Sequence, residues 1–194
     1  MIATQEPIES QEIQQPKNDS VTDLNKNSQY NIFFVDDESM ILKMLERHFS
    51  KDARFQLFSF NSGESCLKSL NKNPDVIILD FNLSDGTDGK MDGLDVLEKI
   101  KEQCPTAQVI MLSSQMEVQV AVDSLKKGAV DYVIKDQAMQ FSVEKAVDSI
   151  LKNKELKQEI NELSLVIKRD KLLIKGYTVI TLLLVGLLSY FWVG

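Results

Sequence analysis

Four short apolar runs, each followed at once by a polar or charged side chain, constrain the fold of this chain more than any other feature. The most complete run, residues 76–80 (VIILD), has four apolar residues, three of them β-branched, and ends in Asp80. Continuous rather than alternating apolar runs are typical of strands buried on both faces of a parallel sheet. The other runs cover residues 32–35, 109–112 and 132–134, and they are followed by Asp36-Asp37, Ser113-Ser114 and Lys135.

Helical patterns separate these runs, and residues 55–58 give one further strand. We expect a short helix at 63–70 with Ser62 as its N-cap, and a third helix that starts near Leu94 and is closed by Pro105. The helix faces that we expect to be buried are Met40, Ile41, Met44, Leu45 and Phe49 in the first helix, Val118, Val120, Ala121 and Leu125 in the fourth, and Val143, Ala146, Val147, Ile150 and Leu151 in the last, which starts near Ser142. Five strands alternating with five helices predict an α/β fold with a parallel, doubly wound sheet.

The polar residues after these runs predict a site. In a parallel α/β sheet, ligands bind at the edge formed by the carboxyl ends of the strands. A carboxylate attacks a phosphoryl group poorly because both are anionic, and a divalent cation removes that repulsion. We therefore expect Asp36 and Asp37 to hold Mg²⁺, Asp80 to act as the nucleophile that forms an aspartyl phosphate, and Lys135 and Ser113 to contact phosphoryl oxygens.

The overall charge argues against one class of partner. The 194 residues carry a formal net charge of −7, whereas nucleic-acid binding needs a basic face. We therefore expect no nucleic-acid partner. The two cysteines have no metal-ligand spacing and predict reduced thiols.

The first 29 residues differ in composition from the rest. They are rich in Gln, Asn, Ser, Glu and Asp, and they contain no aromatic residue; the first one in the chain is Tyr30. Such a segment buries too little surface to offset the cost of ordering, so we predict a disordered tail. It has neither a positive start nor an apolar core, so it is no signal peptide, and we expect the N-terminus to stay in the cytoplasm.

The last helix is expected to continue past the globular part, which we place at residues 30–153. Residues 154–171 contain neither Gly nor Pro and predict a helical linker. Leu156, Ile160, Leu163 and Ile167 are spaced as in a coiled-coil seam, and continuing the seam reaches Asp170. Two interpretations stay open: a homodimer formed through the helix over 141–171, and a solvated linker helix.

The C-terminal residues, 172–194, predict a membrane anchor. Residues 176–194 carry no charge, and as a helix at ~1.5 Å per residue they would span about 28 Å, close to the thickness of a bilayer core. The basic residues of 168–175 precede the span, and Tyr190 and Trp192 lie near its far end, as expected at membrane interfaces. We expect a single-pass tail anchor with the globular domain on the cytoplasmic side.

Residues 30–153 resemble the receiver domain of two-component response regulators. The resemblance rests on five elements in order, each at the end of a predicted strand or the start of a helix. They are Val35-Asp36-Asp37-Glu38, Leu79-Asp80, Met91-Asp92-Gly93-Leu94, Leu112-Ser113-Ser114 and Lys135. The resemblance implies a five-stranded flavodoxin-like fold, Mg²⁺ as cofactor, and a histidine kinase or phosphotransfer protein as partner.

The resemblance also assigns roles to further residues. It implies that the backbone carbonyl of Asn82 completes the metal shell together with Asp80. It implies that Ser113 moves towards a bound phosphoryl group and that Tyr132 then changes between exposed and buried rotamers, although Tyr132 also fits an ordinary tyrosine at the core edge. Asn82 and Gln115 would border the path of the attacking water and so favour self-dephosphorylation.

Three positions depart from the family pattern. The loop over 82–92 is longer than usual, and Ser114 stands where a small apolar residue is common. Asp136 stands where the family usually has a proline in a cis peptide, which makes the placement of Lys135 less certain than that of the acids.

We therefore expect a membrane-anchored, stand-alone receiver that accepts a phosphoryl group and signals by protein–protein interaction. It would not be an enzyme beyond its own phosphorylation and dephosphorylation. The alternative is a docking module with the same fold that works without phosphorylation. A phosphatase of the haloacid dehalogenase type is disfavoured because Asp36 and Asp37 are adjacent rather than separated by one residue.

Overall fold

Five parallel strands form a single sheet in the order β2-β1-β3-β4-β5. The computed structural model describes residues 29–83, 91–114 and 118–193, with side chains described as far as Gly186. Within those ranges the strands are β1 (Tyr30–Val35), β2 (Phe55–Phe60), β3 (Val76–Asp80), β4 (Gln108–Ser113) and β5 (Asp131–Ile134). The predicted parallel α/β sheet is confirmed.

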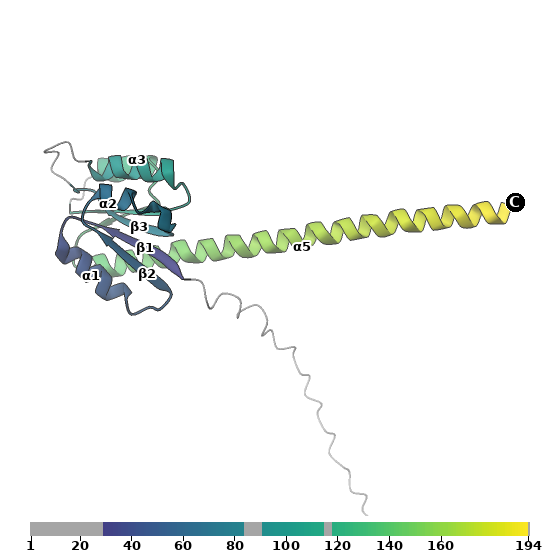
Figure 1. The fold of residues 1–194 in the computed structure, drawn as a ribbon, viewed down its shortest axis with the longest axis horizontal. Coiled ribbons are helices and arrows are strands. Elements are labelled where there is room, and N and C mark those ends of the chain that lie inside the picture. The colour runs from purple at the N-terminus through teal and green to yellow at the C-terminus, as the bar shows by residue number, and fades with distance from the viewer. Residues whose placement is uncertain (1–28, 84–90, 115–117, 194) are drawn as a thin grey trace, which may run out of the picture.

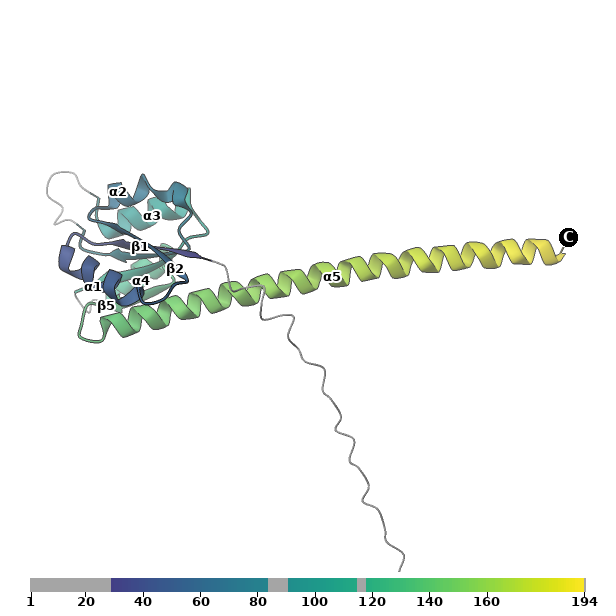
Figure 2. The same cartoon turned by 60° about the horizontal axis from the view of Figure 1, so that its bottom comes forward.

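Helices cover both faces of this sheet. They are α1 (Ser39–Phe49), α2 (Gly63–Leu67), the 3-10 helix η1 (Leu70–Lys72), α3 (Gly93–Gln103), α4 (Val118–Lys126) and α5 (Met139–Val193). In two views, α2 and α3 lie on one side of the sheet and α5 lies on the other (Figure 1 and Figure 2). The helix α2 begins as predicted, because Ser62 Oγ accepts a hydrogen bond from Ser65 N at 3.3 Å.

Alternate residues of the strands belong to two separate cores. Ile32, Phe34 and Ile78 pack with α1 and α5, whereas Phe33, Val35 and Ile77 pack with α2 and α3. Side chains of a strand point to opposite faces in turn, so a strand covered on both faces needs apolar residues at every position. This requirement explains the continuous apolar runs in the sequence.

Two of the predicted helix faces are partly wrong. In α1, Met40 is 79% exposed, and the buried residues are Leu42, Leu45 and Phe49. In α4, Val118 and Leu125 are exposed, and Ser124 is the buried residue named for that helix. Ser124 can be buried because its hydroxyl donates a hydrogen bond to the carbonyl of Val120 at 2.8 Å.

The helix α5 starts three residues earlier than predicted, at Met139 instead of Ser142. The reason lies in Asp136, whose carboxylate accepts a hydrogen bond from Ala138 N at 2.8 Å and whose carbonyl accepts one from Met139 N at 3.2 Å. These contacts satisfy amides that the first turn of a helix leaves unpaired. The predicted buried face is confirmed for Val143, Ala146, Val147 and Leu151, with Ile150 partly buried beside them.

Beyond the domain, α5 continues as a straight rod, which Figure 1 shows in green to yellow. The predicted linker helix over 154–171 is thus helical throughout. Among the residues whose side chains are described, no helix is both long enough and apolar enough to cross a membrane. Part of the predicted span, residues 187–194, lies outside that set.

Candidate functional site

Two buried carboxylates meet at the carboxyl edge of the sheet. Asp36 directly follows β1 and Asp80 ends β3, and these strands are neighbours in which Val35 pairs with Leu79. Both aspartates are 1% exposed, whereas Asp37, the third predicted ligand, is exposed. One carboxylate oxygen from each of the three lies within 4.8 Å of the others. The structure therefore brings the predicted acids together.

Lys135 reaches into the same site from the end of β5. Its Nζ lies 2.8 Å from Asp36 Oδ2, 3.0 Å from Asp80 Oδ2 and 3.3 Å from Glu38 Oε1. The described residues contain no cis peptide bond, so Lys135 takes this position although Asp136 replaces the proline of the family. Its backbone is fixed by a hydrogen bond from Lys135 N to the carbonyl of Ser113 at 2.8 Å.

Burial dominates the electrostatics of the site. It raises the pKa of Asp36 to about 6, although the contact with Lys135 and a hydrogen bond from Glu38 N at 2.9 Å act in the opposite direction. Burial also raises the pKa of Asp80, against the lowering effects of Lys135 and of the backbone at Asn82. Burial lowers the pKa of Lys135, but its contacts with Asp36 and Asp80 outweigh that and raise it. A single lysine thus compensates two buried acids incompletely.

The donor set fits a magnesium ion. Asp80 Oδ1 is buried and has no hydrogen-bond partner among the described residues. A buried oxygen of this kind normally has a partner, and here it lies beside further carboxylate oxygens. Mg²⁺ prefers oxygen ligands and retains several waters, which the exposed position of Asp37 allows.

Gly93 permits the close approach of α3 to the site. A Cβ at Gly93 would lie 2.4 Å from the carbonyl oxygen of Asp80 and 2.7 Å from Phe81 Cα. Both are backbone atoms and cannot move aside as a side chain could. Asp92 caps the same helix, because its carboxylate accepts a hydrogen bond from Asp95 N at 2.8 Å. The sequence interpretation missed this steric role of Gly93, although the position belongs to the Asp92-Gly93 pair that it used.

The two predicted switch residues lie on neighbouring strands. Ser113 ends β4 and is buried, and it pairs in the sheet with Ile134 of β5. Tyr132 is half-buried and packs against the core that contains α3. The switch roles of Ser113 and Tyr132 stay predictions.

The residues expected to influence dephosphorylation are only partly described. Asn82 Nδ2 donates a hydrogen bond to Ser114 Oγ at 3.2 Å, which joins the loop after β3 to the loop after β4. Gln115 and residues 84–90 of the long loop lie outside the described residues. Glu38 also contacts Lys135 in the site, although no role was predicted for it from the sequence. Its position directly after Asp36-Asp37 could have predicted this contact.

This geometry defines a class of protein: a doubly wound α/β domain with a lysine and a group of aspartates that could hold a cation at the carboxyl edge of its sheet. Comparison with protein families assigns the chain to one family of that class. The family model for the response regulator receiver domain matches residues 32–148. The chain therefore belongs to the response regulator receiver family, as the resemblance in its sequence implied.

Individual relatives support the same assignment. The chain is 37% identical over 106 residues to the DNA-binding transcriptional regulator NtrC of Proteus hauseri, with 54% of this chain and 21% of that protein covered. It is 31% identical over 103 residues to the chemotaxis protein CheY of Listeria monocytogenes, with 51% and 81% covered. The crystal structure of NtrX from Brucella abortus matches with a TM-score of 0.60 and 27% identity, covering 69% of this chain and 30% of that one.

Proposed function

We propose that this chain is a phosphoacceptor of two-component signalling. Asp80 accepts a phosphoryl group from a histidine kinase or a phosphotransfer protein in a reaction that depends on Mg²⁺, which Asp36, Asp37, Asp80 and the backbone carbonyl of Asn82 would hold. The observation that carries the proposal is the buried Asp80 carboxylate: its Oδ1 has no hydrogen-bond partner among the described residues, and its Oδ2 lies 3.0 Å from Lys135 Nζ. A carboxylate in such a place is available as a nucleophile and has a cation ready for the incoming charge.

The reaction forms one bond and breaks one. A carboxylate oxygen of Asp80 bonds to phosphorus while the bond between phosphorus and the donor nitrogen or oxygen breaks, and the donor leaves with that electron pair. When bound, the metal ion supplies positive charge that offsets the repulsion between the anions. Lys135 stays close to Asp80 and neutralises a second phosphoryl oxygen, and Ser113 donates a hydrogen bond to another. Water later attacks phosphorus, the bond between phosphorus and the Asp80 oxygen breaks, and inorganic phosphate leaves as the carboxylate is restored; Asn82 and Gln115 would border the path of this water.

The phosphoryl group then acts through protein–protein contacts. Ser113 and Tyr132 change position together, and the surface formed by α4, β5 and α5 changes with them. A receiver of this kind is a signalling domain, and its output requires two states that phosphorylation stabilises differently.

The C-terminal part of α5 attaches the domain to the cytoplasmic face of a membrane. The support comes from the sequence, since residues 176–194 are uncharged and follow a basic stretch. The side chains of Leu182, Leu183 and Val185 are more than half exposed, as is expected of a segment that contacts lipid. Flotation of the full chain with liposomes tests this part, and replacement of Leu183 and Val185 by lysine should abolish flotation.

Mass spectrometry of the intact full chain in detergent micelles tests the phosphoacceptor role. With acetyl phosphate and Mg²⁺, the mass should increase by one phosphoryl group, and the increase should be lost with EDTA or in Asp80→Asn. Asp123→Asn is the matched control, because Asp123 is an aspartate of α4 whose side chain is only partly exposed, at 40%, and lies outside the acidic site. If the native chain gains no mass and binds no Mg²⁺, the docking module without phosphorylation becomes the better interpretation.

A further inference from the structure

An apolar seam runs along α5 after the helix has left the domain. Its side chains are largely exposed, and no other segment of the described chain covers them: the exposed fraction is 46% for Leu156, 64% for Ile160, 56% for Leu163 and 54% for Ile167. Apolar residues repeated at intervals of four and three favour packing against another helix of the same period. A membrane does not explain this stretch, because residues 152–162 between and around the seam are mostly charged or polar.

The residue types in the seam specify the kind of partner. With Leu156 and Leu163 at heptad position d, the positions called a are occupied by Ile160, Ile167 and Ile174. A β-branched residue at a with Leu at d favours two parallel strands over trimers or tetramers. A second copy of this chain carries the same heptad pattern and is therefore the simplest partner.

Two polar residues limit the seam. One heptad before Ile160, Asn153 occupies an a position, where a buried Asn fixes the register and the number of strands. After Ile167, Asp170 occupies a d position, where two carboxylates would face each other. The apolar pairing is therefore expected to be continuous from Asn153 to Ile167 and weak at Asp170.

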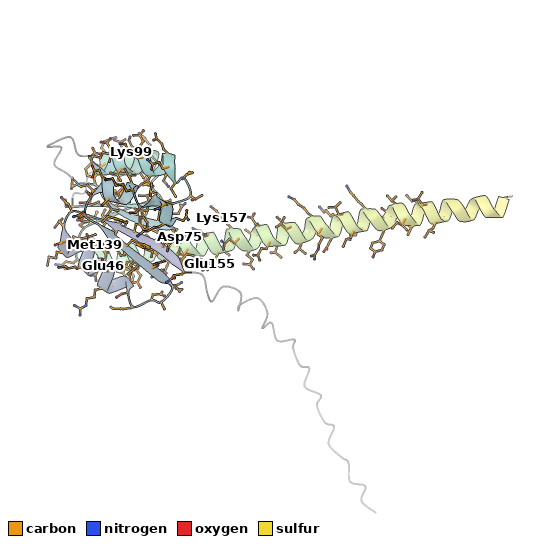
Figure 3. All side chains as sticks on the ribbon, viewed as in Figure 1. Glu46, Asp75, Lys99, Met139, Glu155 and Lys157 are labelled. Carbon is orange, nitrogen blue, oxygen red and sulfur yellow. The ribbon has the colours of Figure 1, made fainter. Side chains whose placement is uncertain are left out.

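The orientation of α5 leaves this seam accessible. On the domain side, Leu151 is buried in the core, and Tyr30 Oη donates a hydrogen bond to Glu155 Oε1 at 2.9 Å. Lys154 forms an ion pair with Asp75 on the same side, and Figure 3 shows Asp75 and Glu155 where the helix leaves the domain. At ~100° per residue, the seam is centred about 150° around the helix from Leu151.

We propose that two copies of this chain pair in parallel and in register through the seam, from Asn153 to Ile167. Because the seam faces away from the domain, each copy places its own receiver on the outer side of the helix pair, and the two domains do not collide. The pairing does not depend on the phosphoacceptor role of Asp80.

The parallel arrangement has an electrostatic signature. Lys152 at position g of one helix would face Lys157 at position e of the second copy, and like charges at these positions weaken pairing. Lys152→Glu replaces two repulsive pairs with two attractive ones, and we expect the dimer to be about threefold tighter at low salt. In an antiparallel pair these two residues do not meet, and the substitution would have no such effect.

Cysteine crosslinking of the full chain in detergent micelles tests the register. In a background that carries Cys104→Ser, Leu156→Cys and Leu163→Cys should each form a covalent dimer with copper phenanthroline as oxidant, because equivalent seam positions lie face to face. The matched control is Leu165→Cys, at an exposed apolar position outside the seam. The proposal is overturned if Leu165→Cys crosslinks as strongly as Leu156→Cys, or if neither Leu156→Cys nor Leu163→Cys crosslinks.

Sedimentation of the same micelles tests the source of association. Ile160→Glu should weaken the dimer about tenfold or more, because it places two charges in an apolar interface, whereas Leu165→Glu should leave it unchanged. A dimer that persists in Ile160→Glu would assign the association to another segment and refute the seam. Phosphorylation of Asp80 should remain intact in Ile160→Glu, so failure of the dimer and failure of the phosphoacceptor role are distinguishable.

Discussion

Replacement of Lys135 by methionine tests the electrostatic account of the site most directly. Lys135 is 7% exposed and contacts both buried aspartates, at 2.8 Å and 3.0 Å. Methionine retains much of the apolar stem but removes the charge. Asp36 and Asp80 would then lie buried side by side with no cation, and removal of one partner of a buried ion pair typically costs 3–5 kcal/mol.

We expect Lys135→Met to lower the free energy of unfolding by about 3 kcal/mol at pH 7 without metal. For a domain of this size, the loss lowers the melting midpoint by roughly 10 °C. Scanning calorimetry of the full chain in micelles measures this change. Lys127→Met is the control, because Lys127 forms an ion pair of the same length, 2.8 Å to Glu98 Oε2, at the surface, and its midpoint should stay close to that of the native chain.

Two conditions should restore the variant. Mg²⁺ supplies the missing positive charge, and a ligand at one hundred times its dissociation constant stabilises the folded state by about 2.7 kcal/mol. Lower pH should act likewise, because a carboxyl whose pKa is raised in the folded state gains stability as pH falls through that pKa. Two results would refute these ion pairs: Lys135→Met unfolds at the native midpoint, or neither Mg²⁺ nor pH 5 reduces the loss of stability in this variant.

Three further predictions concern metal, packing and the helix start. Burial raises the pKa of Asp36 to about 6, and Mg²⁺ binds the deprotonated carboxylate. The apparent Mg²⁺ affinity, measured by titration calorimetry, should therefore be nearly constant above pH 7 and fall by about tenfold per pH unit below pH 6. An affinity that does not depend on pH would contradict the raised pKa. Gly93→Ala should destabilise the domain by about 2 kcal/mol and reduce phosphorylation, since its Cβ collides with the backbone of Asp80; native stability in urea unfolding would show that the helix can shift freely. Asp136→Ala removes the side-chain cap of α5 and should cost about 1 kcal/mol, with faster amide exchange confined to the first turn, whereas Asp136→Asn should largely retain both.

The strands and the acidic site were predictable because both depend on local sequence. The run at 76–80 matches β3 in full, since a strand buried on both faces requires apolar residues at every position and Asp80 must stand at its end. The proximity of Asp36 to Asp80 followed from the parallel order of β1 and β3 alone. Neither inference required knowledge of side-chain packing.

The helix faces were less predictable because α1 and α4 each carry more apolar residues than they bury. Met40 and Val118 fit a helical period as well as their neighbours do, yet they are 79% and 75% exposed. Which stripe faces the sheet depends on how the helix crosses it, and this information is not in the periodicity. Lys135 was uncertain for a related reason: the chain direction after β5 depends on the turn at Asp136, which a pattern of proline positions does not describe.

The connection from β5 to α5 joins the two ends of the domain. Lys135 contacts Asp80 at one edge, and only Asp136, Gln137 and Ala138 separate it from Met139, which is buried in the core with α5. Figure 3 shows Met139 across the domain from Glu155, beyond which the helix leaves the sheet. Asp136 accepts hydrogen bonds from Ala138 N and Met139 N within this short turn. We therefore expect the turn to be too rigid to absorb a displacement of Lys135. If a phosphoryl group on Asp80 moves Lys135, we expect the displacement to act on the start of α5, and amide exchange in the first turn of α5 with and without phosphorylation would measure it.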